Sequence, residues 1–179
     1  MCVIIIKPAG VELPSRQELL KAWMCHPHGF GFATPTKRFR TTVFSTFYKR
    51  LQSVSVDEPC IIHLRYATHG SQKTSNCHPF KKDGIVFAHN GILSITPKGD
   101  KTDSETCFLE YLEPVAKEYG IHSDELRYAV RHVIGGSKFA FMQGDDWVTF
   151  GDFSKYEGRL YSNLRHLYYH PTGLATMLY

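Results

Sequence analysis

The sequence predicts an α+β fold in which antiparallel sheets are segregated from the helices. The predicted strands lie toward both ends of the 179-residue chain, while the longest helical patterns lie between residues 102 and 134. This order, with hairpin-like connections between strands, favours antiparallel sheets over a parallel βαβ sheet. No stretch rich in Pro, Gly or Ser divides the chain, so we expect residues 1–179 to form a single domain.

Strands are expected where β-branched and aromatic residues gather between turn signals. Residues 2–7 are a continuous apolar run, typical of a buried strand. Glycine and aromatic residues alternate over residues 28–34, which predicts a turn feeding a strand that Pro35 closes. The remaining expected strands cover residues 40–44, 60–66, 84–88, 138–142, 147–150 and 160–162, and the pair around residues 144–146 forms a hairpin.

Helix starts are marked by two capping boxes, in which a Ser or Thr is followed three residues later by Glu. One runs from Ser15 to Glu18 and the other from Thr102 to Glu105. Gly120 and the Gly135-Gly136 pair provide stop signals. The expected helices cover residues 15–24, 46–51, 102–119 and 123–134, and the polar stretch over residues 68–76 is expected to be a loop.

The composition narrows the classes of function. The formal net charge is +4 with both signs interspersed, and the basic clusters at residues 37–40 and 49–50 favour solvated faces over a nucleic-acid footprint. The longest apolar run is far shorter than the roughly 18–20 residues of a membrane span, and no signal-peptide order is present. Five cysteines without CxxC spacing favour free thiols in a reducing compartment. We therefore expect a cytoplasmic protein with no nucleic-acid or membrane partner.

Cys2 is the residue that points most directly to chemistry. Cysteine is small enough for removal of Met1 to be expected, which would place a thiol and a free α-amine on one residue. The amine titrates near ~8 and the thiol near ~8.5, so the amine would serve as a base for the sulfur. The thiolate is the attacking species in nucleophilic catalysis. Taken alone, Cys2 is better explained as an arbitrary second residue, so other segments must support a catalytic role.

Three polar clusters lie where predicted strands or loops end. Arg65 at a strand end suits bidentate capture of a carboxylate, or is a surface arginine beside a turn. Asn90-Gly91 is a turn signal, and also a pair of donors for a developing oxyanion. Asp103 lies in the first turn of a capped helix. It either stabilises the helix through a favourable interaction with the helix dipole or binds a substrate ammonium group. The residues alone leave each of these alternatives open.

Considered together, these segments resemble the class II glutamine amidotransferases, whose glutaminase domain is an N-terminal-nucleophile hydrolase. Matching motifs are frequent from residue 2 to about residue 110 and rare afterwards, where residues 161–163 are a further weak match. Tyr66 stands where many members have tryptophan, so the sequence does not decide how Tyr66 affects the closing of the substrate loop. The motifs that carry the resemblance are Cys2 and residues 28–31 (HGFG), 65–70 (RYATHG), 76–79 (NCHP), 89–91 (HNG) and 103–105 (DSE).

The resemblance implies a four-layer αββα sandwich of two antiparallel sheets, the Ntn-hydrolase fold. It also implies that Cys2 attacks the side-chain amide of free L-glutamine, with its own α-amine moving the proton, directly or through a bound water. Asn90 and Gly91 would hold the oxyanion. A γ-glutamyl thioester forms as ammonia leaves, and water then releases glutamate.

The resemblance further assigns substrate-binding residues. Arg65 would pair with the α-carboxylate of glutamine, and Asp103 with its α-ammonium group. Thr68, His69 and Gly70 would belong to the loop that closes over the bound substrate. Because both charges of a free amino acid are recognised, a peptide-bound amide should be a poor substrate.

A partner is expected because larger members of the family carry a synthase domain that uses the ammonia. The 179 residues leave no room for that domain, and no GxxxxGK[ST] phosphate loop is present. We expect a separate ammonia-accepting synthetase or ligase to dock on this protein. The aromatic end, residues 167–179, is one candidate surface, or alternatively a last element that packs on the core.

Three other functions remain as alternatives. The histidines and cysteines at residues 25–28, 63, 69, 77–78 and 89 offer metal ligands, but their spacing fits no standard zinc pattern, so neither a metal nor another cofactor is expected. A non-catalytic glutamine-binding regulatory subunit would keep the pocket without turnover. An amidohydrolase of another small amide would keep the fold and change the substrate.

Overall fold

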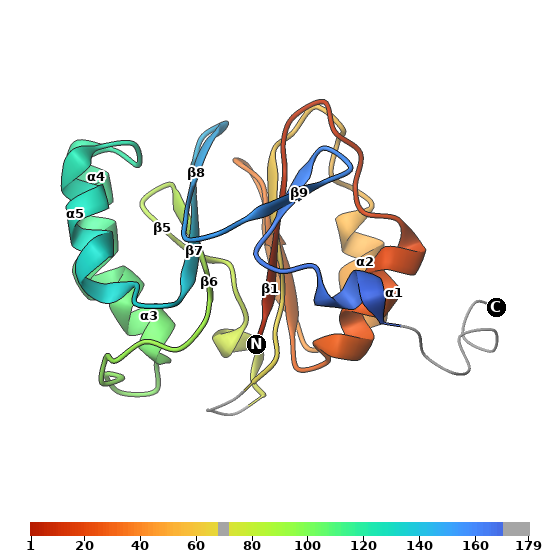
Figure 1. Ribbon diagram of the computed structural model, residues 1–179, viewed down its shortest axis with the longest axis horizontal. Coiled ribbons are helices and arrows are strands. Elements are labelled where there is room, and N and C mark those ends of the chain that lie inside the picture. The colour runs from red at the N-terminus through yellow and green to blue at the C-terminus, as the bar shows by residue number, and fades with distance from the viewer. Residues whose placement is uncertain (68–71, 170–179) are drawn as a thin grey trace.

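The structure, a computed structural model, describes residues 1–67 and 72–169 and arranges them in four layers (Figure 1). Two sheets pack face to face in the middle, and every strand pair in them is antiparallel. The six-stranded sheet contains, in spatial order, β3 (Arg38–Thr41), β2 (Phe30–Ala33), β4 (Cys60–Leu64), β1 (Val3–Lys7), β10 (Arg159–Tyr161) and β9 (Ser154–Tyr156). The four-stranded sheet contains β5 (Phe80–Lys82), β6 (Ile85–Asn90), β7 (Lys138–Gln143) and β8 (Asp146–Phe150).

Helices form the two outer layers and confirm the predicted αββα sandwich. Figure 1 shows one group of helices outside each sheet. The six-stranded sheet is covered by α1 (Arg16–Cys25) and α2 (Phe44–Leu51), and the four-stranded sheet by α3 (Asp103–Cys107), α4 (Glu113–Tyr119) and α5 (Asp124–Val133). Among the residues described, no helix is long and apolar enough to cross a membrane.

β1 is buried on both faces, which explains its unbroken apolar run. Val3 and Ile5 belong to the core cluster under α1 and α2. Ile4 and Ile6 belong to the cluster between the two sheets. Since side chains alternate along a strand, Cys2 falls on the same side as Ile4, facing the other sheet.

The same alternation orients the end of β6. Phe87 belongs to the core under α3, α4 and α5, while Val86 and Ala88 belong to the cluster between the sheets. His89 is therefore directed toward the helical layer and Asn90 toward the six-stranded sheet. Cys2 and Asn90 thus occupy facing sides of the two sheets.

Several predicted boundaries were wrong, for identifiable reasons. The strand expected over residues 40–44 lies at Arg38–Thr41, and Phe44 already begins α2. The single helix expected over residues 102–119 is broken by a π-helical turn, Phe108–Leu112, before α4. Pro114 lies in the first turn of α4 and has no backbone N–H to bond back into a continuous α-helix, which accounts for the break.

Two short elements were not predicted as strands, and the C-terminal end of the chain is only partly described. β5 and β9 have three residues each. The predicted loop before β5 contains a 3₁₀ turn, Thr74–Asn76, and another 3₁₀ turn, Arg165–Tyr168, follows β10 and contacts α1. The rest of the aromatic end, from residue 170 onward, lies outside the described residues.

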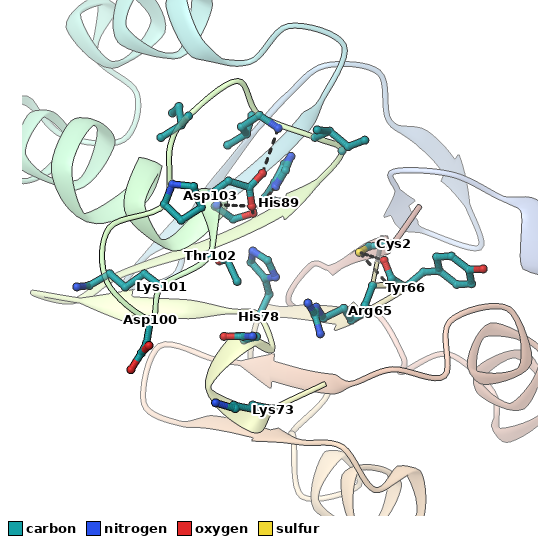
Figure 2. A pocket seen from close by; sticks show the side chains of 18 of the residues that line it. Cys2, Arg65, Tyr66, Lys73, His78, His89, Asp100, Lys101, Thr102 and Asp103 are labelled. Atoms are coloured by element: carbon teal, nitrogen blue, oxygen red, sulfur yellow. Dashed lines mark hydrogen bonds between the residues drawn. The ribbon is translucent and has the colours of Figure 1, made fainter. Parts of the chain in front are cut away.

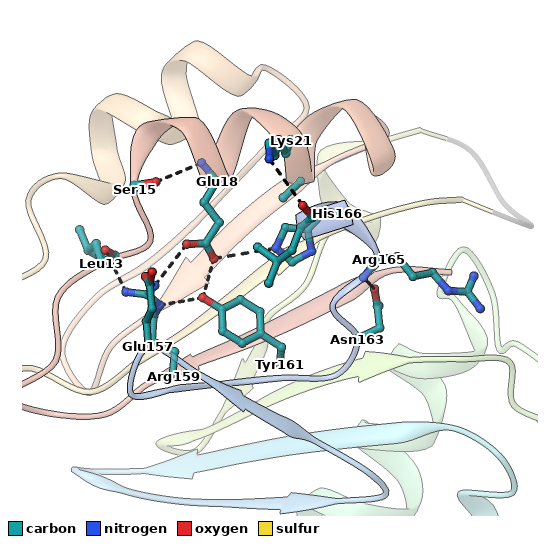
Figure 3. Close-up of polar contacts among 12 residues, drawn as sticks. Leu13, Ser15, Glu18, Lys21, Glu157, Arg159, Tyr161, Asn163, Arg165 and His166 are labelled. Carbon is teal, nitrogen blue, oxygen red and sulfur yellow. Dashed lines mark hydrogen bonds and ion pairs between the residues drawn. The ribbon is translucent and has the colours of Figure 1, made fainter. Parts of the chain in front are cut away.

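A buried polar cluster connects β10, the last strand of the six-stranded sheet in sequence order, to α1 (Figure 3). Glu18 on α1 is 7% exposed, and its carboxylate accepts hydrogen bonds from Tyr161 (2.5 Å) and Arg159 (3.2 Å). Burial opposes ionisation of Glu18, but the contact with His166 (3.8 Å), the Tyr161 hydrogen bond and the charge of Arg159 outweigh it and hold the pKa of Glu18 below its usual value. The buried Glu18 carboxylate therefore stays ionised and links α1 to β10 through Arg159 and Tyr161.

We predict that Arg159→Met lowers the free energy of unfolding by about 3–5 kcal/mol, because it leaves the buried Glu18 carboxylate without its ion-pair partner. The Glu18→Gln/Arg159→Met double variant should recover much of that loss, since no buried charge is left unpaired. Chemical denaturation followed by circular dichroism measures both values.

The matched control is Lys98→Met, which breaks an ion pair between side chains that are 61% and 40% exposed. Its effect should stay within about 1 kcal/mol. An equally small effect of Arg159→Met would show that the buried cluster does not anchor β10.

Candidate active site

A pocket of about 560 Å³ opens where the start of β1 and the ends of β4 and β6 meet the start of α3 (Figure 2). Antiparallel pairing of Val3 with Leu64 brings the residue before β1 beside the residue after β4. The lining includes four residues that the sequence singled out, each from a different segment of the chain: Cys2, Arg65, Gly91 and Asp103. The strand directions therefore bring these four residues, which the sequence presented as separate motifs, together around one pocket.

Cys2 is held by its sulfur and by its backbone. The Tyr66 N–H lies 3.4 Å from the sulfur, and the Asn163 side-chain amide donates to the Cys2 carbonyl at 2.7 Å. Burial raises the pKa of the Cys2 thiol, although the Tyr66 N–H, the terminal ammonium and the Arg65 guanidinium act in the opposite direction. A thiol in this position needs a base to become an effective nucleophile.

Arg65 is positioned by the glycine turn that precedes β2. The Arg65 N–H donates to Gly29 O at 2.8 Å, and the His28 N–H donates to Arg65 O at 3.0 Å. Gly29 has a φ of 157°, and a Cβ there would overlap the Cys77 sulfur. The turn therefore requires glycine, and it fixes the backbone from which the buried Arg65 side chain enters the pocket lining.

Asn90 and Gly91 occupy different positions relative to the pocket. Gly91 lines it with a φ of 150°, and a Cβ there would lie 2.6 Å from Ser137 Cβ, so only glycine fits. Asn90 is buried and is not among the lining residues; its side-chain amide contacts Ser162 Oγ at 2.9 Å. The structure thus brings Gly91 to the pocket surface and keeps the Asn90 side chain beneath it.

Asp103 both organises its loop and lines the pocket. Its carboxylate accepts hydrogen bonds from the N–H groups of Leu93 (3.2 Å) and Ser104 (2.8 Å). The Ser104 hydroxyl lies 2.6 Å from His89 Nδ1, which links the loop to the end of β6. Figure 2 shows Asp103 with His89 on one side of the pocket and Cys2 with Arg65 on the other.

The expected substrate loop, Thr68, His69 and Gly70, lies outside the described residues. Sequence reasoning gave no role to several polar residues around the site. Lys73, Lys101 and Ser104 line the pocket, and Ser137 and Asn163 contact residues that line it, whereas Ser162 contacts Asn90 beneath it. The only sequence signal for Ser162 and Asn163 was the weak family match at residues 161–163, to which no role was assigned.

Three buried histidines lie together at this end of the sandwich. The ring centres of His63 and His78 are 4.5 Å apart, and those of His78 and His89 are 6.2 Å apart. Burial lowers the pKa of His63 to about 3 and that of His89 to about 4, and it holds the pKa of His78 well below its usual value. Within residues 1–67 and 72–169, no three His, Cys, Asp or Glu side chains are arranged to hold a metal ion.

These histidines predict a loss of stability in mild acid. Their pKa values are lower in the folded state than the unfolded value near ~6.5, so the unfolded chain binds protons first as the pH falls. The free energy of unfolding should therefore decrease from about pH 6.5 toward about pH 4, by up to roughly 1.4 kcal/mol per pH unit for each histidine. Urea titrations across this range measure the slope.

The variant His78→Phe should show a shallower slope than the wild-type protein, because one buried titratable ring is removed. His132→Gln, which replaces an exposed histidine, is the matched control and should leave the slope unchanged. Identical slopes for His78→Phe and wild type would contradict the assignment.

Comparison with known proteins identifies related sequences. Residues 38–175 match the model of the family described as glutamine amidotransferases class-II. The glutamine–fructose-6-phosphate aminotransferase of Rhizobium leguminosarum bv. viciae is 30% identical over an alignment of 100 residues, with a coverage of 50% of this chain and 16% of that protein. The Caulobacter vibrioides protein of the same name is 40% identical over 50 residues, which are 25% of this chain and 8% of that protein. The matched region is thus a small part of these relatives' own length.

Solved structures share the fold. The glutamine phosphoribosylpyrophosphate (PRPP) amidotransferase from B. subtilis, complexed with ADP and GMP, superposes with a TM-score of 0.58 at 17% identity, covering 90% of this chain and 41% of that one. A structure described as the allosteric regulatory enzyme of purine biosynthesis gives 0.57 at 15% identity, with the same coverage. At these identities the likeness shows the Ntn-type fold, whereas the family match extends over most of the sequence. The chain belongs to the class II glutamine amidotransferases.

Proposed function

We propose that this protein hydrolyses free L-glutamine through a thioester on an N-terminal cysteine and supplies the ammonia to a separate acceptor enzyme. One observation carries the proposal: Cys2, Arg65, Gly91 and Asp103 line a single pocket although they come from four segments of the chain. They are a nucleophile, a cation for a carboxylate, a backbone donor and an anion for an ammonium group. In this reading the described domain acts as one glutaminase unit.

Removal of Met1 would activate the nucleophile. The Met1 side chain is 53% exposed, which supports access to the bond that joins it to Cys2. Cleavage would leave the α-amine of Cys2 a few bonds from its own sulfur, and a neutral amine accepts the thiol proton. Because burial raises the pKa of the Cys2 thiol, such a base is required near neutral pH.

The proposed reaction has two steps. The Cys2 sulfur bonds to the carboxamide carbon, the C–N bond breaks, and ammonia leaves with the proton taken from the thiol. Water then attacks the resulting γ-glutamyl thioester, which releases glutamate and restores the thiol. The Gly91 N–H and the Asn90 amide would stabilise the oxyanion formed in both steps, and losing one such donor typically costs about 3 kcal/mol.

Arg65 and Asp103 would select a free amino acid. Their opposite charges on opposite sides of the pocket suit the α-carboxylate and α-ammonium groups of glutamine (Figure 2). Each charge-assisted hydrogen bond contributes about 1.5–3 kcal/mol. Thr68, His69 and Gly70 would close over the bound substrate.

An acceptor for the ammonia would be a separate synthetase or ligase. The relatives' names pair glutamine with an acceptor, fructose 6-phosphate, and this chain matches only a small part of each. That pattern supports a glutaminase unit whose acceptor site lies elsewhere. The five cysteines, all within the described ranges, are free thiols, which supports a cytoplasmic location.

We predict that Cys2→Ala lowers glutamate release from glutamine by at least about 1,000-fold, because the only proposed nucleophile is removed. Cys25→Ala, which removes another partly exposed thiol, should keep the wild-type rate. Intact mass spectrometry before and after 6-diazo-5-oxonorleucine should show loss of Met1 and one adduct on Cys2. An active protein that retains Met1, or an active Cys2→Ala variant, would refute the mechanism.

We predict that Asp103→Asn raises the KM for glutamine by about 10–100-fold, because the charge for the substrate ammonium is lost while an oxygen for the Leu93 N–H remains. Arg65→Gln should act similarly through the carboxylate. Glu110→Gln, an exposed residue outside the pocket, is the control and should leave KM unchanged.

The same assays separate the alternative functions. N-acetylglutamine, which lacks the ammonium group, should be cleaved at least about tenfold more slowly than glutamine by the wild-type enzyme. Equal rates would favour an amidohydrolase of other small amides. Glutamine binding without turnover in both the wild-type and Cys2→Ala proteins would favour a regulatory subunit.

A further inference from the structure

One buried hydroxyl connects the strand of the nucleophile to the asparagine proposed for the oxyanion. Ser162 directly follows β10 and is 1% exposed. Its Oγ accepts a hydrogen bond from the Ile4 N–H at 2.9 Å and lies 2.9 Å from the Asn90 side-chain amide. The Ser162 N–H also donates to Ile4 O at 2.9 Å. Because Ile4 lies two residues from Cys2 and Asn90 belongs to the other sheet, Ser162 bridges the two layers at the site.

The hydrogen-bonding capacity of Ser162 defines the orientation of the Asn90 amide. The orientation with Nδ2 toward Ser162 leaves Asn90 Oδ1 buried without a partner among the described residues. Rotation of the amide by half a turn allows the Ser162 O–H to donate to Oδ1 while its Oγ still accepts from the Ile4 N–H. The Ile4 N–H, the Ser162 hydroxyl and Asn90 Oδ1 are then all paired. The amide Nδ2 becomes the free donor, which is the group that stabilisation of an oxyanion requires.

The neighbours of Ser162 hold the same region in place. Asn163 donates to the Cys2 carbonyl at 2.7 Å. Lys138, which pairs with Asn90 across β6 and β7, donates from Nζ to Ser162 O at 2.5 Å. Residues 162–163 therefore contact the nucleophile, its strand, the asparagine and the adjoining strand of the second sheet.

We propose that Ser162 is a positioning residue for amide hydrolysis, because its hydroxyl orients the Asn90 side-chain amide with Nδ2 available to the oxyanion and keeps it in register with Cys2. The inference rests on the proposed function, since it assigns Asn90 as an oxyanion donor. Ser162 itself does not touch the substrate. Its effect should therefore appear in the chemical step and not in substrate binding.

The test compares Ser162→Ala with Thr106→Val. Thr106 is also a buried residue whose hydroxyl accepts a backbone N–H, from Lys98, but it lies outside the pocket lining. We expect Ser162→Ala to lower kcat for glutamine by about 100-fold or more and to change KM by less than about threefold. Thr106→Val should keep the wild-type kcat. A wild-type kcat for Ser162→Ala would overturn the proposal.

Inhibitor binding separates positioning from a general structural role. Glutamate γ-semialdehyde adds the Cys2 thiol to give a tetrahedral adduct with an oxyanion, whereas glutamate binds without forming one. Ser162→Ala should weaken the aldehyde by about the same factor as kcat and leave glutamate binding unchanged. Equal weakening of both ligands would mean that Ser162 only maintains the pocket. Ser162→Cys, which keeps a small side chain and a weak hydrogen bond, should have an intermediate kcat and serves if the alanine variant does not fold.

A measurement without turnover distinguishes failure of this inference from failure of the proposed function. The ¹⁵N-labelled side-chain amide of Asn90, assigned by its loss in Asn90→Asp, should shift in NMR spectra of Ser162→Ala or Ser162→Cys and remain unchanged in Thr106→Val. Unchanged Asn90 signals in the Ser162 variants would overturn the positioning role, whether or not the wild-type protein hydrolyses glutamine. If the signals shift but the wild-type protein releases no glutamate, the proposed function fails and the contact stands.

Discussion

The position of β1 in the middle of the six-stranded sheet is the constraint on which the site depends. β1 pairs with β4 on one side and β10 on the other, and both partners run antiparallel to it. The start of β1 therefore lies beside the ends of both neighbours. Arg65 follows one of these ends and Ser162 follows the other, so strand direction alone brings both residues next to Cys2.

The packing of the two sheets supplies the second half of the site. Small side chains, including Ala33, Ala88 and Ala140, belong to the cluster between the sheets and allow the layers to approach closely. Alternation along β1 and β6 then directs Cys2 and Asn90 toward the same interface. The asparagine is buried where the sheets meet, while the pocket opens at the edge of that interface. The candidate site thus lies at a boundary between layers, with each layer contributing different groups.

The sequence was most informative where local composition and chemistry agree. Residues 2–7 and 84–88 are apolar enough to be strands in almost any context, and the capping serine Ser15 marks a helix start by a local hydrogen bond to the Glu18 N–H. β5 and β9 were missed because three residues rich in lysine and serine are strands only through their pairing with β6 and β10. Such pairing is a property of the assembled sheet, so no short window contains it.

In the candidate site too, residues that stand out locally were found from the sequence, whereas contacts between distant residues were not. Cys2, Arg65 and Asp103 were singled out because their chemical type stands out at the start or end of an element, and the family resemblance then gave them their expected roles. The contacts of Ser162 were not predicted, because a serine after a strand has many ordinary explanations. Its role is visible only through partners that lie 72 and 158 residues away along the chain.

The pairing of β1 with β10 has a consequence for the order of assembly during synthesis. β10 is synthesised long after β1, so Ile4 meets its partner Ser162, 158 residues further along the chain, only after the intervening segments have been made. Contacts of such long sequence separation form late and slowly. Until then Cys2 lacks both the hydrogen bond from Asn163 to its carbonyl and the neighbouring strand β10, so the nascent chain carries the thiol without a complete pocket.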